Sequence, residues 1–221
     1  MDGLLMRRLA VNSLFIAAIA LAATVARDAA AADVVVPHDP SAWDATTLIS
    51  NACSKCHGAA GVSISPLFPI LAGQQGSYIE TELKLFRQRG RSDPLARAFM
   101  WGIARGLTDD QIEGVAQYFA SQPPVRGTSS SNPALAEKGK LIYENGVPAR
   151  GVIACMTCHG PKAEGDGNNA FPRLAGQHRD YLVTELQQFR GLLRENAVMQ
   201  GVAANITDDE IASVAEYLAS K

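Results

Sequence analysis

The pattern Cys-x-x-Cys-His occurs twice, at residues 53–57 and 155–159, and the two copies use all four cysteines of the chain. Cysteines three positions apart lie on the same side of one helical turn, where both thiols can reach the vinyl groups along one edge of a porphyrin. The histidine that follows directly can then bind the iron, so the pattern is typical of c-type haem attachment. The sequence therefore predicts two covalently bound haem c groups, with these attachment cysteines and iron-binding histidines: Cys53, Cys56 and His57 for one, Cys155, Cys158 and His159 for the other.

Zinc binding and disulfide bonding are the alternative uses of paired cysteines. A zinc site brings two Cys-x-x-Cys pairs to one tetrahedral ion and does not need a histidine after each pair. Here the pairs are far apart in the chain, and each has its own histidine. Four cysteines in 221 residues are also too few for a disulfide-dense secreted domain. Both alternatives are less favoured than haem.

The N-terminal residues have the pattern of an export signal. Arg7 and Arg8 precede an uncharged apolar run, and the alanines at 30–32 form a small-residue cleavage site. We expect residues 1–32 to be a signal peptide, with cleavage after Ala26 and an uncleaved membrane anchor as alternatives. Because alanine-rich segments are weakly hydrophobic, cleavage is favoured. The mature chain is then expected in the periplasm, where c-type haem is attached, and peripheral association with the membrane stays open.

The charge of the chain restricts the choice of partners only slightly. The formal net charge is −2, which argues against nucleic acid as a partner. A near-balanced surface neither demands nor excludes a protein partner. The length of the mature chain suits two small domains better than one large domain.

The second half of the chain repeats the first. Residues 68–74 and 171–177 both read Phe-Pro-x-Leu-Ala-Gly-Gln, and similar amphipathic helix patterns follow each copy. Each half closes with a helix whose start is marked by a capping box, at residues 108–111 and 207–210. Between the halves, residues 122–133 are rich in proline, glycine and serine. We therefore expect an N-terminal domain at 33–121, a linker at 122–133 and a C-terminal domain at 134–221.

No convincing strand pattern occurs in the mature chain. We expect an all-α fold of two tandem domains, each wrapped around one haem. The glycine- and proline-containing segment 145–153 is expected to be a surface loop before the second haem motif.

The remaining axial ligand of each iron decides between an electron carrier and an enzyme. Of the five methionines, Met1 and Met6 lie in the expected signal and Met156 lies between two haem-binding cysteines. Met100 and Met199 remain, at equivalent positions of the repeat. Core packing is the ordinary role of such a methionine, but two methionines at matching positions of the repeat favour iron ligation. A filled sixth position leaves no open site on the iron, which favours an electron carrier.

On these motifs the chain resembles the di-haem class I c-type cytochromes of the cytochrome c4 type, over essentially its whole mature length. The resemblance implies two haem domains that face each other across a pseudo-twofold interface. It also implies His57 and Met100 on one iron, and His159 and Met199 on the other. The carbonyls of Pro69 and Pro172 would accept a hydrogen bond from the proximal imidazoles and hold them in place.

Class I domains usually have a small residue and an aromatic residue where the first helix crosses the last. Gly139 and Tyr143 match this pair in the second half, and the first half lacks it. The first helix of that half is therefore expected to be short or differently packed.

The resemblance also implies a function. It implies a periplasmic electron carrier, not an enzyme, that takes electrons from a quinol-oxidising complex or a dehydrogenase and passes them towards a terminal oxidase. The cytochrome subunit of a periplasmic dehydrogenase that oxidises sulfide, thiosulfate or an alcohol would have the same residues. A di-haem peroxidase needs a five-coordinate iron, and the paired methionines argue against it.

Several polar residues are expected to lie at the surface. His38 and His178 belong to no ligand pattern. The arginines at 87, 89, 91 and 97 are expected to form a solvated helix end, with haem propionate pairing or partner docking as alternatives. Gln74 and Gln177 are further candidates for propionate binding.

Overall fold

The computed structural model describes residues 42–129 and 131–221. The expected signal peptide at 1–32 and His38 lie outside these residues. Within them every regular element is a helix, and β-type pairing is confined to two isolated bridges. In this described part of the chain, no helix has the length and apolar character needed to cross a membrane. The prediction of an all-α chain is confirmed.

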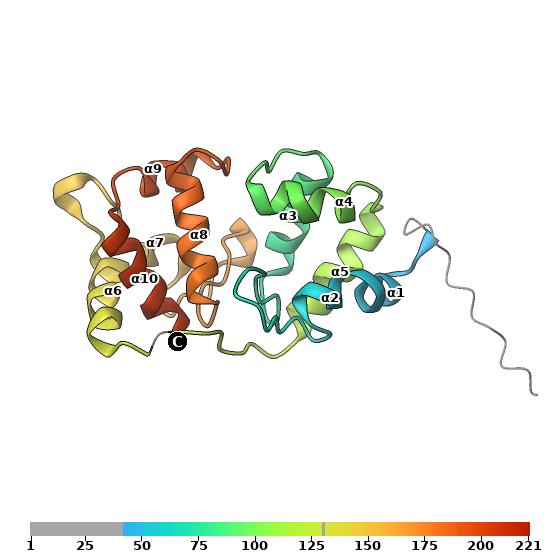
Figure 1. The fold of residues 1–221 in the computed structure, drawn as a ribbon, viewed down its shortest axis with the longest axis horizontal. Helices are drawn as coiled ribbons and strands as arrows, with labels where there is room; N and C mark the ends of the chain where they lie inside the picture. Colours follow the sequence, from blue (N-terminus) through green and yellow to red (C-terminus); the bar gives the residue numbers. More distant parts are fainter. Residues whose placement is uncertain (1–41, 130) are drawn as a thin grey trace, which may run out of the picture. The chain divides into compact units, whose positions relative to one another are not determined.

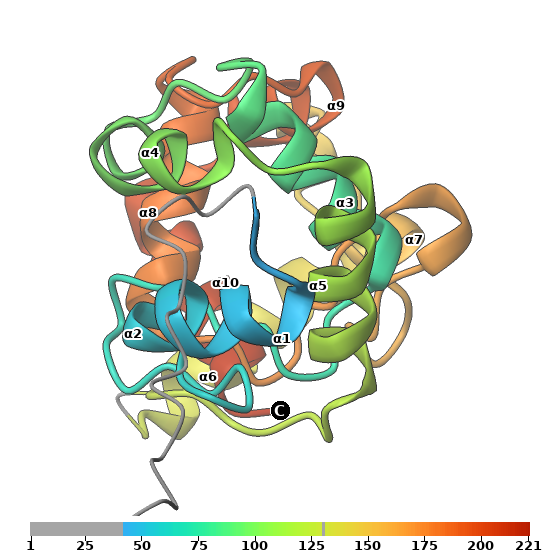
Figure 2. The same cartoon turned by 90° about the vertical axis from the view of Figure 1, so that its right-hand side faces the viewer.

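The first half of the described chain forms one group of helices around a core of its own (Figures 1 and 2). Figure 2 shows α3 and α5 side by side, and these two helices pack against each other. The elements in chain order are α1 (Ala45–Leu48), η2 (Ile49–Cys53), α2 (Ser54–His57), α3 (Gly76–Arg87), η3 (Ala96–Met100), α4 (Trp101–Ala104) and α5 (Asp109–Ser121).

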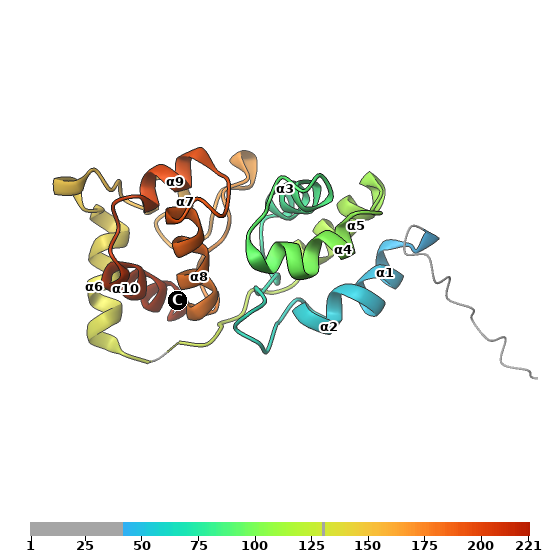
Figure 3. The same ribbon diagram turned by 45° about the horizontal axis from the view of Figure 1, so that its top comes forward.

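The second half repeats this order with a longer first helix. Figure 3 shows α6 crossing α10, and the two helices share an extensive contact. The elements are α6 (Pro133–Asn145), η4 (Pro148–Arg150), α7 (Met156–His159), η5 (Gly167–Asn169), α8 (Arg179–Arg190), α9 (Ala197–Ala203) and α10 (Asp208–Ala219).

Both predicted capping boxes are present at the last helix of each half. The Thr108 hydroxyl accepts a hydrogen bond from the Gln111 amide, and the Gln111 side chain reaches back to the Thr108 amide. Thr207 and Glu210 make the same pair of contacts at α10. Each box satisfies amide groups that a helix start otherwise leaves without partners. Helices α5 and α10 thus begin where the sequence predicts.

The two halves differ at their first helix, as expected. In α6, a Cβ atom at Gly139 would overlap the Ser213 carbonyl of α10, so only glycine allows this close crossing. Tyr143 is fully buried one turn later, and its hydroxyl donates to the Gly160 carbonyl over 2.7 Å. In the first half, α1 has only four residues and continues into the π-helical turn η2.

The segment 145–153 is a surface loop held at several points. An antiparallel bridge joins Val147 to Val152, and Val152 is buried although its neighbours are not. Arg150 pairs with Glu210 at the start of α10. The loop is therefore tied to the last helix of its own half.

His178 is not a surface residue, and that expectation was wrong. Its side chain is 2% exposed and lies where the two halves meet the linker. Nδ1 accepts a hydrogen bond from the Thr128 amide over 3.0 Å. The proton therefore sits on Nε2, which donates to the Ser63 carbonyl over 2.9 Å. The His178 ring thus joins three segments that are distant in sequence, those of Ser63, Thr128 and His178 itself. A local sequence pattern does not predict such a position.

Candidate haem-binding sites

Each Cys-x-x-Cys-His motif forms a single helical turn at the edge of a cavity. Cys53 and Cys56 line this cavity with His57, and Cys155 and Cys158 do so with His159. All four thiols are free. Burial raises the pKa of the Cys53 and Cys155 thiols to about 11. Among the described residues no group of three or more His, Cys, Asp or Glu side chains is placed to hold a metal ion.

The two histidines are held in the same way. His57 is 8% exposed, and its Nδ1 lies 2.9 Å from the carbonyl oxygen of Pro69. His159 is similarly buried, with Nδ1 3.0 Å from the carbonyl oxygen of Pro172. A carbonyl only accepts hydrogen bonds, so Nδ1 carries the proton and Nε2 keeps its lone pair for a metal.

Burial also keeps both imidazoles neutral. It lowers the pKa of His57 and His159, and the proline carbonyls offset this only in part. An aromatic ring flanks each imidazole, with Phe68 edge-on to His57 and Phe171 tilted against His159. Each ring is thus a pre-oriented neutral ligand.

One cavity of about 480 Å³ extends across both halves and contains the methionines expected as iron ligands. Met100 at the end of η3 lines it in the first half, and Met199 in α9 lines it in the second. Asn196 caps α9 by accepting a hydrogen bond from the Met199 amide over 3.0 Å. The lining is mostly apolar, as the buried face of a porphyrin requires. Two cysteines and one neutral imidazole from each half line this cavity, so these residues fit two haem c groups.

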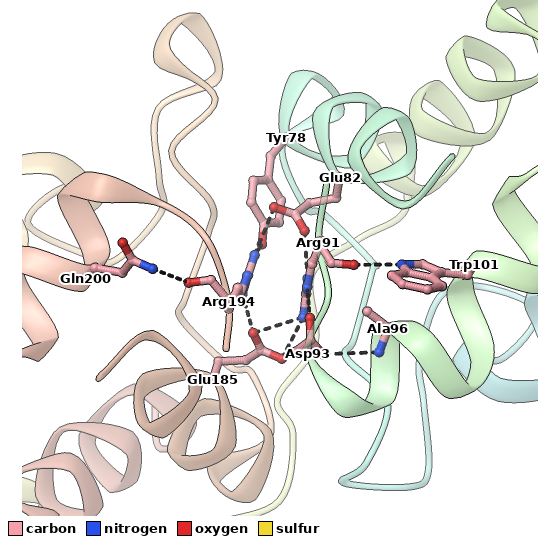
Figure 4. Close-up of polar contacts among 9 residues, drawn as sticks. All are labelled: Tyr78, Glu82, Arg91, Asp93, Ala96, Trp101, Glu185, Arg194 and Gln200. Carbon is pink, nitrogen blue, oxygen red and sulfur yellow. Dashed lines mark hydrogen bonds and ion pairs between the residues drawn. The ribbon is translucent and has the colours of Figure 1, made fainter. Parts of the chain in front are cut away.

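A cluster of largely buried charges lies between the two groups of helices, and all of its members except Asp93 line the same cavity (Figure 4). Arg91 donates to Glu82 over 2.6 Å and to both oxygens of Glu185 over 2.8 and 3.0 Å. Arg194 donates to Glu82 over 2.9 Å and also pairs with Glu185. Arg91 makes a further contact of 2.6 Å with Asp93. We call these five residues, Glu82, Arg91, Asp93, Glu185 and Arg194, the buried ion cluster.

The expectation of a solvated position was wrong for Arg91. Its side chain is 7% exposed, and its guanidinium lies over the ring of Phe86 at 4.9 Å. Arg89 and Arg97 are exposed, as expected. Each guanidinium lies over the Trp101 ring, at 5.3 and 5.8 Å from the ring centre. Arg91 is buried because carboxylates from both halves satisfy its donors.

Two glutamines join the halves reciprocally. The Gln177 side chain accepts from the Ile70 amide over 2.9 Å and donates to the Ile70 carbonyl over 3.0 Å. Gln74 makes the same pair of contacts with the backbone of Arg173, over 2.7 and 3.0 Å. We call this arrangement the glutamine pair. The side-chain amides thus bind backbone of the opposite half.

Replacing Gln177 with alanine is expected to destabilise the folded protein by about 2 kcal/mol, because the buried Ile70 amide and carbonyl lose their partners. Urea unfolding of the haem-loaded protein measures the change. Gln117→Ala is the matched control, since Gln117 is exposed and its side chain donates to Glu113 one turn away. An equal effect of the two substitutions would contradict the role given to Gln177.

Sequence reasoning missed the buried ion cluster and the glutamine pair as contacts between halves. One signal was available in the repeat, since these pairs occupy equivalent positions: Gln74 and Gln177, Glu82 and Glu185, Arg91 and Arg194. A repeated residue indicates that the same position matters in both halves, but the repeat does not predict which residue it contacts.

Comparison with known proteins agrees with this geometry. The family model for cytochrome c matches residues 44–123 and again residues 136–221. A cytochrome c4 of Thiocapsa roseopersicina is 42% identical over 185 residues, which is 81% of this chain and 91% of that protein. The thiosulfate dehydrogenase electron acceptor of Stutzerimonas stutzeri is 34% identical over 174 residues, covering 76% of this chain and 78% of that protein.

A solved structure is also similar. The cytochrome c4 of Acidithiobacillus ferrooxidans superposes with a TM-score of 0.72 at 39% identity, over 76% of this chain and 98% of that one. Two family matches in one chain, together with relatives of this similarity, establish the class of protein. The chain belongs to the cytochrome c family and, within it, to the di-haem cytochromes c4, which are electron-transfer proteins and not enzymes.

Proposed function

We propose that this protein carries single electrons in the periplasm, from a quinol-oxidising complex or a dehydrogenase towards a terminal oxidase. It does so through two haem c groups. The first is held by thioether bonds to Cys53 and Cys56, with His57 and Met100 as iron ligands. The second is held by Cys155 and Cys158, with His159 and Met199 as iron ligands. A haem of this kind supplies an iron that gains or loses one electron.

The observation that carries the proposal is that each half contributes one histidine and one methionine to the lining of the cavity, His57 and Met100 from the first half and His159 and Met199 from the second. The proline carbonyl on Nδ1 orients each imidazole, so that Nε2 can bind the iron. Thioether sulfur on the opposite side favours the reduced state and raises the potential. The apolar lining excludes water. An iron held by one histidine and one methionine would keep no open position for peroxide or another substrate.

Replacing Met100 or Met199 with alanine is expected to remove the sulfur-to-iron absorption band of one haem and to lower the potential of that haem. The physical reason is the loss of the thioether ligand. Optical spectra of each oxidised variant, together with a redox titration, measure both changes. Met156→Ala is the matched control, because this methionine lies between the attachment cysteines and packs in the core of its half.

The outcome for each haem is independent of the other. Retention of the full band in the Met100 or Met199 variant would exclude that methionine as a ligand. Loss of the band in the Met156 variant would show that any core substitution perturbs the iron, and the ligand assignment would then fail.

The location and the domain boundaries are part of the same proposal. We place the mature chain in the periplasm after removal of residues 1–32, with haem domains at 33–121 and 134–221 and a linker at 122–133. The export pattern of the N-terminal residues supports the location, because c-type haem is attached after export. Growth of cells that express the full chain, followed by fractionation and N-terminal sequencing, tests both the compartment and the cleavage point.

A second candidate is the electron-accepting subunit of a periplasmic dehydrogenase. The similarity to a thiosulfate dehydrogenase electron acceptor supports it. The haem residues would be the same, and only the donor would differ. Purification from native membranes and periplasm distinguishes the two candidates. A flavin- or haem-containing dehydrogenase that co-purifies with this chain in constant ratio would support the subunit and contradict the free carrier.

A further inference from the structure

In the first half, the chain that carries Met100 forms a closed loop on the buried ion cluster (Figure 4). Trp101 directly follows Met100, and its indole Nε1 donates a hydrogen bond to the carbonyl oxygen of Arg91 over 2.7 Å. The guanidinium of Arg91 is fixed by three carboxylates of the cluster. Within the loop, Oδ1 of Asp93 accepts a hydrogen bond from the Ala96 amide over 3.1 Å. The methionine thus lies between a capped helical turn and a residue that is anchored to the cluster.

The second half closes an equivalent loop with a different side chain. Gln200 directly follows Met199, and its Nε2 donates to the carbonyl oxygen of Arg194 over 3.1 Å. Glutamates of both halves hold the Arg194 guanidinium. Asn196 caps α9 by accepting a hydrogen bond from the Met199 amide over 3.0 Å. The closing contact is therefore present in both halves, although the loop from Arg194 is the shorter of the two.

The two closing residues have a hydrogen-bond donor in common and little else. Trp101 is partly buried and packs against the hydrophobic core of its half, with the guanidinium groups of Arg89 and Arg97 over its ring. Gln200 is also partly buried but has no ring. If packing were the only role of this position, an apolar side chain would fill the space and leave no polar group to satisfy. The feature common to both halves is an N–H group directed at the carbonyl of the cluster arginine.

A residue that fixes a metal ligand affects how firmly the ligand binds, and loss of such a residue typically weakens a metal site roughly 10- to 100-fold. We propose that Trp101 and Gln200 are positioning residues for the iron ligands Met100 and Met199, because each closes the loop that carries the methionine. Without the closing hydrogen bond the arginine carbonyl loses its partner and the loop gains freedom. The thioether then leaves the iron more readily. This inference rests on the two His/Met sites proposed above.

The test is a titration of the oxidised, haem-loaded protein with imidazole, a ligand that suits iron and replaces a loosely held methionine. Loss of the sulfur-to-iron absorption band follows the displacement. The first half is measured in a Met199→Ala background, in which the remaining band belongs to Met100. Trp101→Phe retains an aromatic ring and removes the N–H donor. We expect this variant to bind imidazole about tenfold more tightly than the background protein does.

The second half is measured in the same way in a Met100→Ala background, in which the remaining band belongs to Met199. Gln200→Leu removes the donor and fills a similar space, and we again expect about tenfold tighter imidazole binding. Gln200→Lys has a side chain of comparable reach that can still donate to the Arg194 carbonyl. This variant should bind imidazole as weakly as its background does.

Trp43→Phe is the control for the loss of a tryptophan that packs against the same core. The proposal is overturned if Trp101→Phe binds imidazole no more tightly than Trp43→Phe, or if Gln200→Leu and Gln200→Lys have equal affinities. If Trp101→Phe does not fold, the two Gln200 variants decide alone. A Met199→Ala background that kept the full band would contradict the proposed ligands themselves. A background that loses half of the band, combined with unchanged imidazole affinities, would contradict the positioning role alone.

Discussion

Replacing Glu185 with glutamine is expected to destabilise the folded protein by about 3–5 kcal/mol. Glu185 is 5% exposed and accepts hydrogen bonds from Arg91, with Arg194 as a second ion-pair partner. Glutamine has nearly the same shape but no charge, and its amide group is a donor that would face guanidinium donors. Two buried arginines would then share one fewer carboxylate. The loss of folding free energy caused by an uncompensated buried charge exceeds the loss caused by most surface substitutions.

Chemical unfolding of the haem-loaded protein measures this loss. Glu195→Gln is the matched control, since Glu195 is an exposed glutamate of the same half and its substitution should change stability by less than about 0.5 kcal/mol. The buried ion cluster would be excluded as a major source of stability if the two variants unfolded at the same denaturant concentration.

Gly139→Ala is expected to be the other severe substitution, with a loss of about 3 kcal/mol or more. The added Cβ atom would overlap the backbone of Ser213 in α10, and backbone cannot move aside as a flexible side chain can. Helices α6 and α10 would have to separate, and Tyr143 would lose part of its burial. Thermal unfolding of the second half, monitored by the absorption of its haem, measures this loss as a lower midpoint temperature.

The same substitution at Gly201 should have the opposite sign. Gly201 lies within α9, and no atom is close to the position of an added Cβ. Alanine should therefore stabilise the helix by about 0.5–1 kcal/mol, through its lower backbone entropy in the unfolded chain. Equal destabilisation by the two glycine substitutions would contradict the steric explanation for Gly139.

Short-range patterns predicted much of this structure because their chemistry is local. The helical turns at both Cys-x-x-Cys-His motifs follow from the haem-attachment spacing, and the starts of α5 and α10 follow from the capping boxes at Thr108 and Thr207. The repeat predicted two all-helical halves, and the absence of a small and an aromatic residue predicted the short α1. The family itself could be identified from these motifs.

The contacts between the halves could not be predicted in this way. His178, Arg91 and Glu185 contact residues about a hundred positions away, and a local pattern does not contain the partner of such a residue. A lone arginine or histidine next to a helix is usually solvated, so burial was not the expected outcome. Only the packed structure shows that opposite charges from both halves make burial favourable.

The glutamine pair has a consequence for the ancestry of the chain. Contacts that are reciprocal between equivalent residues are those of an isologous dimer, in which one surface binds a copy of itself. This tandem protein therefore has the interface of a homodimer inside one polypeptide. In a homodimer every substitution appears twice, so the two subunits cannot differ at equivalent positions. Within one polypeptide that constraint is absent, and the two halves do differ: Asp93 follows Arg91 by two positions, where Asn196 follows Arg194.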